Sequence, residues 1–175
     1  MSEIWDLYDA RGNKSEKTIE RNSGERIPDG LYHIVCDILV QHEDGSYLLM
    51  ERDHNKDVYP GYFEAAAGGS AITGESPLMC AVRELREETG IIVSTDDLEL
   101  VNHIVVDRNH CIFFSYYVKV KCKKDSVTLQ EGETVGYRWV DEKGFLEYVD
   151  SDKSIKNRNL RYEEYISGIR RKYEK

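Results

Sequence analysis

Short apolar runs dominate the first third of the chain, and sequences that favour turns separate them. Alternating or continuous apolar runs of this length are typical of strands. Turn-forming residues stand at positions 9–13 and 43–45. We therefore expect a small hairpin over residues 3–20, followed by two adjacent strands over residues 31–40 and 47–50.

The middle of the chain changes from strand-like to helical spacing. A strand-like segment at residues 62–67 is followed by a polar loop that ends in Ser76 and Pro77, which suit the cap and the first position of a helix. Gly90 suits the C-terminal stop, so the spacing predicts a helix over residues 77–89. The stripe that repeats at helical spacing and is expected to pack on the sheet consists of Leu78, Val82, Leu85 and Thr89.

The second half of the chain carries the remaining strands and one further helix. Branched and aromatic residues predict strands over residues 98–106, 112–120 and 135–140. Near the end, apolar residues recur at helical spacing, which predicts an amphipathic helix that covers one face of the body. These residues are Tyr162, Ile166, Ile169 and Tyr173. Strands interrupted and flanked by helices predict an α/β layered fold.

The length and the charge of the chain limit its organisation and its partners. A chain of 175 residues provides one hydrophobic core but not two ordinary domains. We expect a single domain, with residues 1–30 as an N-terminal hairpin extension and residues 31–175 as the main part. The 33 acidic residues outnumber the 24 basic ones, and the net charge of −9 argues against nucleic acid as a large partner. A small phosphorylated partner remains compatible, because a bound metal ion reverses the local field.

Cysteine usage and the N-terminus favour a cytoplasmic location. The four cysteines form no CxxC pair, and the first residues have neither a basic start nor an apolar signal core. No apolar stretch is long enough to span a bilayer, so we expect no membrane partner. The oligomeric state stays open, and a homodimer is compatible with the sequence.

Three glutamates of the predicted helix offer a metal site. Glu84, Glu87 and Glu88 share one face of the helix, roughly opposite the apolar stripe. Like charges at this spacing destabilise a helix, and crowding raises the pKa of such carboxyls unless a cation compensates them. A hard divalent ion with oxygen ligands suits them, Mg²⁺ above all, with Mn²⁺ as a substitute.

Neighbouring residues are expected to support this site. Arg83 lies one helical turn before Glu87 and is expected to pair with that carboxylate or with Glu75, which fixes its orientation. At Gly68 and Gly69 the backbone can pass close to a metal ion or a phosphate, where a Cβ atom would obstruct it. A salt-bridged surface helix would have similar charges, but the spacing of the glycines and of Glu75 favours the metal site.

The spacing of these residues resembles a complete Nudix box. It runs from Gly69 over Glu75 to the segment Arg83-Glu-Leu-Arg-Glu-Glu-Thr-Gly-Ile91. The resemblance implies a Nudix-type α/β/α sandwich with a mixed central sheet. It also implies a pyrophosphohydrolase that cleaves a diphosphate linkage, typically in a nucleoside diphosphate linked to another moiety. The three glutamates would then bind Mg²⁺, with the carbonyl of Gly69 as a further ligand.

The reaction also needs a general base and contacts to the substrate outside the box. The base is expected to be the box residue Glu87 or a glutamate in a later loop, where Glu133 has Glu131 as a competitor. Arg52, at the end of a predicted strand, resembles an arginine that some Nudix enzymes direct at the substrate phosphate. An exposed arginine at a strand end is otherwise usually solvated.

Two other functions are compatible with parts of the sequence. Trp5-Asp-Leu-Tyr-Asp9 and Tyr59-Pro-Gly61 resemble the isopentenyl diphosphate isomerase branch of the fold. The cysteine and the metal-binding histidine of those isomerases are absent from Ala65-Ala-Ala-Gly-Gly69. A non-catalytic nucleotide-binding sensor would use the same fold, because function resides in sites and not in the scaffold. The intact box favours hydrolysis over both.

Overall fold

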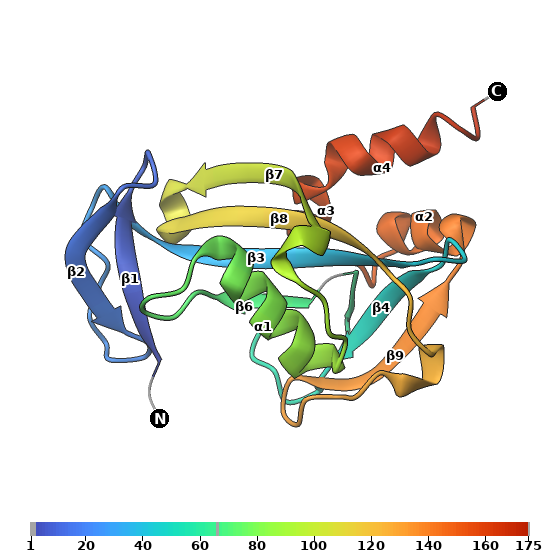
Figure 1. Cartoon of the computed structure of the whole chain (residues 1–175), viewed down its shortest axis with the longest axis horizontal. Coiled ribbons are helices and arrows are strands. Elements are labelled where there is room, and N and C mark those ends of the chain that lie inside the picture. Colours follow the sequence, from blue (N-terminus) through green and yellow to red (C-terminus); the bar gives the residue numbers. More distant parts are fainter. Residues whose placement is uncertain (1–2, 66, 175) are drawn as a thin grey trace.

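The computed structural model describes residues 3–65 and 67–174. Within this part of the chain, nine strands form one sheet along the path β2-β1-β3-β4-β5, with β6 and β8 joined to β3, β7 to β8 and β9 to β4 (Figure 1). The strands are β1 (Ile4–Asp9), β2 (Lys14–Glu20), β3 (Leu31–His42), β4 (Tyr47–Arg52), β5 (Phe63–Glu64), β6 (Ala67–Ser70), β7 (Leu98–Val106), β8 (Cys111–Val120) and β9 (Thr134–Val140). The helices are α1 (Pro77–Thr89), α2 (Glu142–Asp150), α3 (Lys156–Arg161) and α4 (Glu163–Arg170).

The long strand β3 organises the sheet. It runs parallel to β8, with His33 opposite Cys111 at one end and His42 opposite Val120 at the other. It is antiparallel to β1, β4 and β6. The sheet is therefore mixed, as the resemblance implied. The pairing with β3 also brings β6, which carries both glycines of interest, to the middle of the sheet.

Two hydrophobic cores lie on opposite faces of this sheet. Alternate residues of β3 point to opposite faces, so Ile38 belongs to the core under α1, whereas its neighbour Leu39 belongs to the core under α2 and α4. The first core includes Leu85 of α1, and the second includes Phe145 of α2 and Ile166 of α4. The predicted α/β/α sandwich is confirmed.

The predicted N-terminal hairpin is present as β1 and β2 and extends the sheet beyond β3. The side chain of Asp9 closes its turn by accepting hydrogen bonds from the backbone N–H groups of Arg11 and Asn13, at 2.8 and 3.0 Å. Leu7 and Ile19 are buried. The hairpin therefore has a packed face as well as backbone pairing.

The same hairpin is bonded to the loop that leads to α1. The N–H of Thr73 donates to the carbonyl of Ile4 at 2.7 Å, and the N–H of Gly74 donates to Oδ2 of Asp6 at 2.8 Å. Asp6 is 4% exposed, and Nζ of Lys14 lies 2.7 Å from the same Oδ2 atom. The extension and the loop before α1 thus form one connected unit.

One predicted strand is divided in the structure. The segment expected over residues 62–67 contains β5 and the start of β6, and Ala66 lies outside the described residues. β5 pairs with β4, whereas β6 pairs with β3. The prediction of one strand was wrong because an apolar run does not reveal that the chain changes partners within it. The strands predicted over residues 98–106, 112–120 and 135–140 are confirmed as β7, β8 and β9.

The predicted tail helix differs in extent. Tyr162 separates α3 from α4 with φ −110° and ψ 15°, α4 ends at Arg170, and Tyr173 is 57% exposed beyond it. The side chain of Tyr162 is buried and donates to the carbonyl of Tyr116 at 3.2 Å, which fixes the break. The helix α2 had no counterpart among the predictions. No helix in the described part of the chain is long and apolar enough to cross a membrane.

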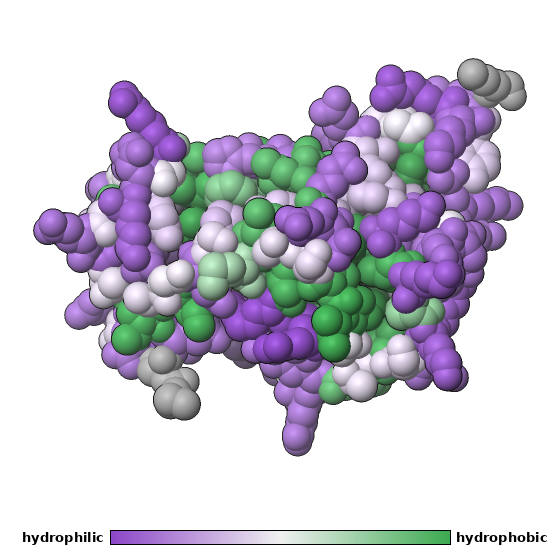
Figure 2. All heavy atoms as spheres, viewed as in Figure 1, coloured by the Kyte–Doolittle hydropathy of each residue, from purple (hydrophilic) through white to green (hydrophobic). Residues whose placement is uncertain are grey.

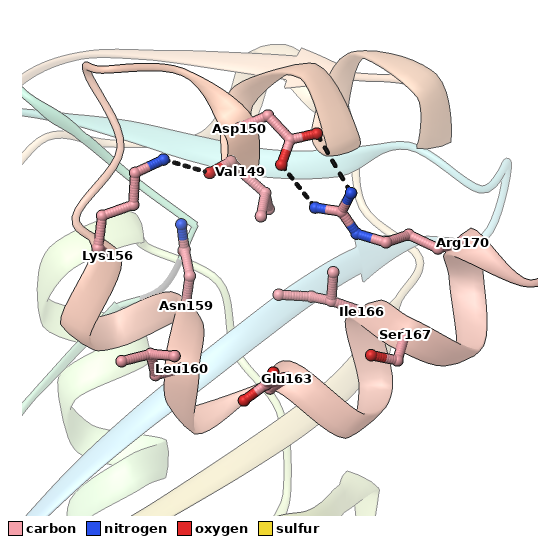
Figure 3. A pocket seen from close by; sticks show the side chains of 9 residues that line it. All are labelled: Val149, Asp150, Lys156, Asn159, Leu160, Glu163, Ile166, Ser167 and Arg170. Carbon is pink, nitrogen blue, oxygen red and sulfur yellow. Dashed lines mark hydrogen bonds and ion pairs between the residues drawn. The ribbon is translucent and has the colours of Figure 1, made fainter.

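The short helix α3 is fixed from both sides. At its start, Nζ of Lys156 donates to the carbonyl of Val149 in α2 at 2.8 Å (Figure 3). At its end, Nδ2 of Asn102 in β7 donates to the carbonyl of Arg161 at 2.8 Å. These two contacts fix the position of α3, and with it the position of its side chains, relative to the sheet.

The molecular surface mixes polar and apolar residues. On the face seen in Figure 2, hydrophobic residues gather toward the middle and hydrophilic residues surround them. Met79 in α1 and Ile92 shortly after it are 52% and 80% exposed. Single exposed apolar residues are common on protein surfaces, so the homodimer stays a prediction.

Candidate active site

The helix α1 occupies the segment predicted for it because local signals fix both of its ends. Oγ of Ser76 accepts a hydrogen bond from the N–H of Met79 at 3.2 Å. Gly90 adopts a left-handed conformation with φ 72°, which favours glycine, and its N–H donates to the carbonyl of Arg86 at 2.9 Å. The predicted helix is confirmed at both limits.

The buried face of α1 is rotated relative to the predicted stripe. Its buried residues are Cys80, Ala81, Leu85 and Thr89. Leu78 and Val82 are only partly buried. The small side chains of Cys80 and Ala81 let the helix approach the sheet closely. In this orientation Glu84 and Glu88 face β6, so the expectation that these glutamates lie opposite the packed face was wrong.

Glu84 and Glu88 lie against the glycine pair, Gly68 and Gly69 of β6. The N–H of Gly68 donates to Oε2 of Glu88 at 3.1 Å. A Cβ atom added to Gly69 would lie 2.5 Å from Oε1 of Glu84. The side chain of Glu84 is 14% exposed, whereas that of Glu87 is 39% exposed. Two carboxylates are therefore enclosed at β6, and the third lies at the rim.

Gly68 has a structural role in the sheet. A Cβ atom at this position would lie 2.1 Å from the carbonyl oxygen of Cys36 and 2.9 Å from Cα of Asp37. Both atoms belong to the backbone of β3. The sheet pairing thus requires glycine here, independently of any metal ion or phosphate. Of the two glycines, only Gly69 lies so close to a carboxylate that a Cβ atom would meet it.

Alanine substitutions are expected to separate these two roles. Gly68→Ala drives a Cβ atom into the backbone of β3, so we expect the free energy of unfolding to fall by about 2 kcal/mol. Gly69→Ala meets only the rotatable end of Glu84, so we expect a loss of stability under about 1 kcal/mol together with weaker Mg²⁺ binding. Urea unfolding and the Mg²⁺-dependent shift in melting temperature measure the two effects. Equal destabilisation by both substitutions would contradict the distinction.

Arg83 connects the loop before α1 to two of the glutamates. Its Nε atom lies 2.7 Å from Oε1 of Glu75, and its Nη1 atom lies 2.7 Å from Oε1 of Glu84 and 3.1 Å from Oε2 of Glu87. Its Nη2 atom donates to the carbonyl of Ser70 at 3.1 Å. The pairing expected for Arg83 is observed, with Glu84 as an additional partner. The Glu75 carboxylate raises the pKa of Arg83.

The enclosed glutamates carry poorly compensated charge. Burial raises the pKa of Glu88 to about 8, and the carboxylates of Glu64 and Glu84 add to this effect while Arg158 opposes it. Burial also raises the pKa of Glu84. A cation close to these carboxylates would favour their charged forms. The donor set therefore fits a hard divalent ion in its chemistry.

Binding such an ion requires local rearrangement. Within residues 3–65 and 67–174, no three histidine, cysteine, aspartate or glutamate side chains stand together as a ready metal site. The guanidinium group of Arg83 contacts both Glu84 and Glu87 and takes up oxygens that a metal ion would need. For Glu84 and Glu87 to bind such an ion, oxygens that now pair with Arg83 would have to become free.

Glu133 precedes β9 and reaches the cavity of the α1 glutamates, which has a volume of about 150 Å³. Its Oε2 atom lies 2.5 Å from Nζ of Lys56, and its side chain is 38% exposed. Glu131, by contrast, is exposed and does not line this cavity. Of the two loop glutamates considered as the base, Glu133 is therefore the one beside the box.

Arg52 is enclosed, and the interpretation of this residue as a solvated strand end was wrong. Its side chain is 15% exposed, and Nη1 lies 2.6 Å from Oε1 of Glu64. Its Nε atom donates to the carbonyl of Val58 at 3.2 Å. Arg52 lines a second cavity, of about 330 Å³, which shares Gly68 and Gly69 with the first. The second cavity therefore borders the glycine pair of the box.

Three charged residues around the second cavity were missed by the sequence analysis. They are Glu64 of β5 and Arg158 and Arg161 of α3. Glu64 pairs with Arg158, and Arg161 pairs with Asp37 of β3. The sequence has one signal for this cluster, namely that Arg158 and Arg161 stand three positions apart just before the predicted tail helix. Their acidic partners lie far away in the chain and cannot be inferred from that spacing.

Comparisons with a family model and with known sequences point to the same family. Residues 31–158 match the family of NUDIX domains. An uncharacterized Nudix hydrolase of Listeria monocytogenes is 35% identical over 91 residues, which cover 52% of this chain and 53% of that protein. Nudix hydrolase 3 of Arabidopsis thaliana is 31% identical over 96 residues, which cover 54% of this chain and 12% of that protein. The chain thus spans about half the length of the first relative and less of the second.

Comparison with solved structures concerns the fold. A protein from Deinococcus radiodurans aligns with a TM-score of 0.69 and 17% identity, over 97% of this chain and 98% of that chain. The NUDIX domain of NrtR from Shewanella oneidensis, solved as a complex with ADP ribose, aligns with a TM-score of 0.52 and 16% identity, over 66% and 77% of the two chains. At such identities the likeness is one of architecture.

Proposed function

The chain belongs to the Nudix family, and from that premise we propose that it hydrolyses a diphosphate linkage with the help of a divalent metal ion. The observation that carries the proposal is the enclosure of Glu84 and Glu88 against the glycine pair, with Arg83 beside them. Nudix hydrolases act on small phosphorylated molecules. The substrate proposed here is a nucleoside diphosphate linked to another moiety.

Mg²⁺ is the proposed ion, with Mn²⁺ as a substitute. Its proposed ligands are Glu84, Glu87, Glu88 and the carbonyl of Gly69, because carboxylate and carbonyl oxygens suit this ion. When bound, the ion would offset the negative charge of the diphosphate and lower the pKa of a water molecule bound to it. Arg83 also contacts Glu75, which lies in the loop before α1, and would so keep that loop in place when the ion binds.

Glu133 is the proposed general base. It takes a proton from the attacking water as the new oxygen–phosphorus bond forms, while the anhydride bond breaks and the leaving group departs with the electron pair. The ammonium group of Lys56, 2.5 Å from Oε2, orients this carboxylate. Glu87 is the alternative base, because it also borders the cavity.

A panel of nucleoside diphosphate derivatives tests the proposal directly. With Mg²⁺ or Mn²⁺ we expect at least one member to be cleaved into two phosphorylated products, or into a phosphorylated product and phosphate. Addition of EDTA is expected to stop the reaction, because the enclosed carboxylates then lack their cation. Chromatographic detection of the products measures turnover. Consumption of no member with either ion would contradict hydrolysis of this substrate class.

The second candidate is nucleotide binding without turnover. The observation in its favour is the contact of Arg83 with both Glu84 and Glu87, because it pairs oxygens that a catalytic metal ion would need. Calorimetric binding of panel members in the absence of any cleavage would support it. The structure does not support the isomerase alternative. Ala65 and Ala67 are buried, and their methyl side chains cannot transfer protons.

A further inference from the structure

The second cavity receives three arginines that the Nudix box does not include. Arg52 comes from the end of β4, and Arg158 and Arg161 come from α3. All three line a space that borders Gly68 and Gly69. The glycine pair therefore separates the α1 glutamates on one side from a group of guanidinium groups on the other.

Arg161 is structural. Its Nη2 and Nε atoms lie 2.8 and 2.6 Å from the two carboxylate oxygens of Asp37. Asp37 is 2% exposed and Arg161 is 9% exposed, so the pair neutralises itself inside the protein. The guanidinium group also stacks on the ring of Phe113, with its carbon 4.2 Å from the ring centre. Arg161 thus has little charge to offer to a ligand.

Arg52 and Arg158 are in a different situation, because they share one carboxylate. Oε1 of Glu64 pairs with Arg52 at 2.6 Å, and Oε2 pairs with Arg158. Glu64 is 5% exposed, so it is fixed in place and cannot exchange these partners for water. A guanidinium group has five N–H donors, so sharing one carboxylate leaves donors of Arg52 and Arg158 for a further acceptor. Guanidinium groups in such an arrangement suit the oxygens of a phosphate.

The rest of the cavity wall is mostly apolar. Val35, Phe113 and Ile155 line it together with Val58 and Tyr59. A volume of about 330 Å³ is at the small end of the range of roughly 300 to 1,000 Å³ found for ligand cavities. The space suits one ring-bearing group with its phosphate and is too small to enclose two nucleosides.

We propose that Arg158, held beside Arg52 by the carboxylate of Glu64 that both share, binds one phosphate of the substrate's diphosphate, and that the apolar wall around Phe113 binds a single ring group attached to it. This inference rests on the proposed function and adds to it a phosphate-binding residue, Arg158, and an apolar wall for one ring group. The diphosphate then extends across the glycine pair, from the arginines to the α1 glutamates. Arg158 is the decisive residue, because α3 supplies it from outside the box.

Binding of two non-hydrolysable probes in the presence of Mg²⁺ tests the inference. One is α,β-methylene ADP, which has a ring, and the other is methylenediphosphonate, which has none. We expect Arg158→Gln to weaken the binding of both probes by about 10- to 100-fold, because it removes a charged hydrogen-bond donor. Phe113→Leu is expected to weaken only the probe with a ring, by about 3- to 10-fold. Isothermal titration calorimetry measures both effects.

The matched control is Arg138→Gln, which removes the same charge from an exposed arginine of β9 and should leave both affinities unchanged. Arg158→Lys keeps the charge but loses the planar fork, so its affinities should fall between those of the wild type and Arg158→Gln. It also replaces Arg158→Gln if that variant fails to fold by circular dichroism. Wild-type affinity for both probes in Arg158→Lys and in every folded Arg158→Gln preparation would overturn the inference.

The result also separates this inference from the proposed function. Turnover by the wild type together with unchanged probe binding in Arg158→Gln would refute the arginine subsite and leave hydrolysis intact. Probe binding that depends on Arg158, without turnover of any diphosphate, would support the subsite and refute hydrolysis. For an active enzyme, we further expect KM to rise more than kcat falls in Arg158→Gln, because the contact forms already in the bound substrate.

Discussion

Replacing Glu88 with glutamine is expected to slow diphosphate hydrolysis at least about 100-fold, because losing a metal ligand costs no less than losing a residue that supports one. The amide keeps the shape of the carboxylate, and its oxygen can still accept the N–H of Gly68, now 3.1 Å from Oε2 of Glu88. The substitution also removes a buried negative charge close to Glu64 and Glu84. The metal-free variant should therefore be at least as stable as the wild type.

Two measurements on the same samples check this expectation. The first is kcat/KM at saturating Mg²⁺, and the second is the melting temperature with and without Mg²⁺, which rises when an ion binds the folded state. Glu87→Gln should act in the same direction as Glu88→Gln. Arg86→Gln is the control, because Arg86 is an exposed residue of the same helix. Wild-type turnover in the Glu88→Gln variant would refute the assignment of this residue.

Replacing Asp37 with asparagine is expected to lower the free energy of unfolding by about 3 to 5 kcal/mol, the usual cost of breaking a buried ion pair from one side. The substitution leaves Arg161, which is 9% exposed, without a carboxylate at 2.6 Å. Arg161 ends α3, so the helix that delivers Arg158 should also loosen. Chemical denaturation at neutral pH measures the change.

A double substitution distinguishes lost charge pairing from lost packing. Asp37→Leu combined with Arg161→Met removes both charges and fills the space with apolar groups, so we expect a much smaller loss of stability than in Asp37→Asn. Because the backbone carbonyl of Arg161 accepts from Asn102, that contact survives in the double variant. A loss below about 1 kcal/mol in Asp37→Asn alone would show that the pair is not a major support of the fold.

Elements with local signals were predictable from the sequence. The ends of α1 depend on Ser76 and Gly90, whose caps act on backbone groups within four residues. The hairpins around residues 9–13 and 43–45 follow from turn residues between apolar runs. The family resemblance at the box needs only spacing along one segment. In each case the physical cause lies within a short stretch of chain.

Features that depend on contacts between distant segments were not predictable. The rotation of α1 follows from the small residues Cys80 and Ala81 meeting a glycine-containing strand, which a pattern of large apolar residues does not reveal. The enclosure of Arg52 depends on Glu64 and on an arginine of α3 that arrives from the other end of the chain. The break at Tyr162 reflects a tertiary hydrogen bond to Tyr116.

The bonds from Ile4 and Asp6 to Thr73 and Gly74 change what a minimal version of this protein would be. The family match begins at residue 31, and a shortened version cut at that point would retain every letter of the signature. It would nevertheless lack the hairpin of β1 and β2, to which the loop before α1 is hydrogen-bonded. For this chain, we expect the segment that holds the loop before α1 in place to be longer than the segment that carries the family signature.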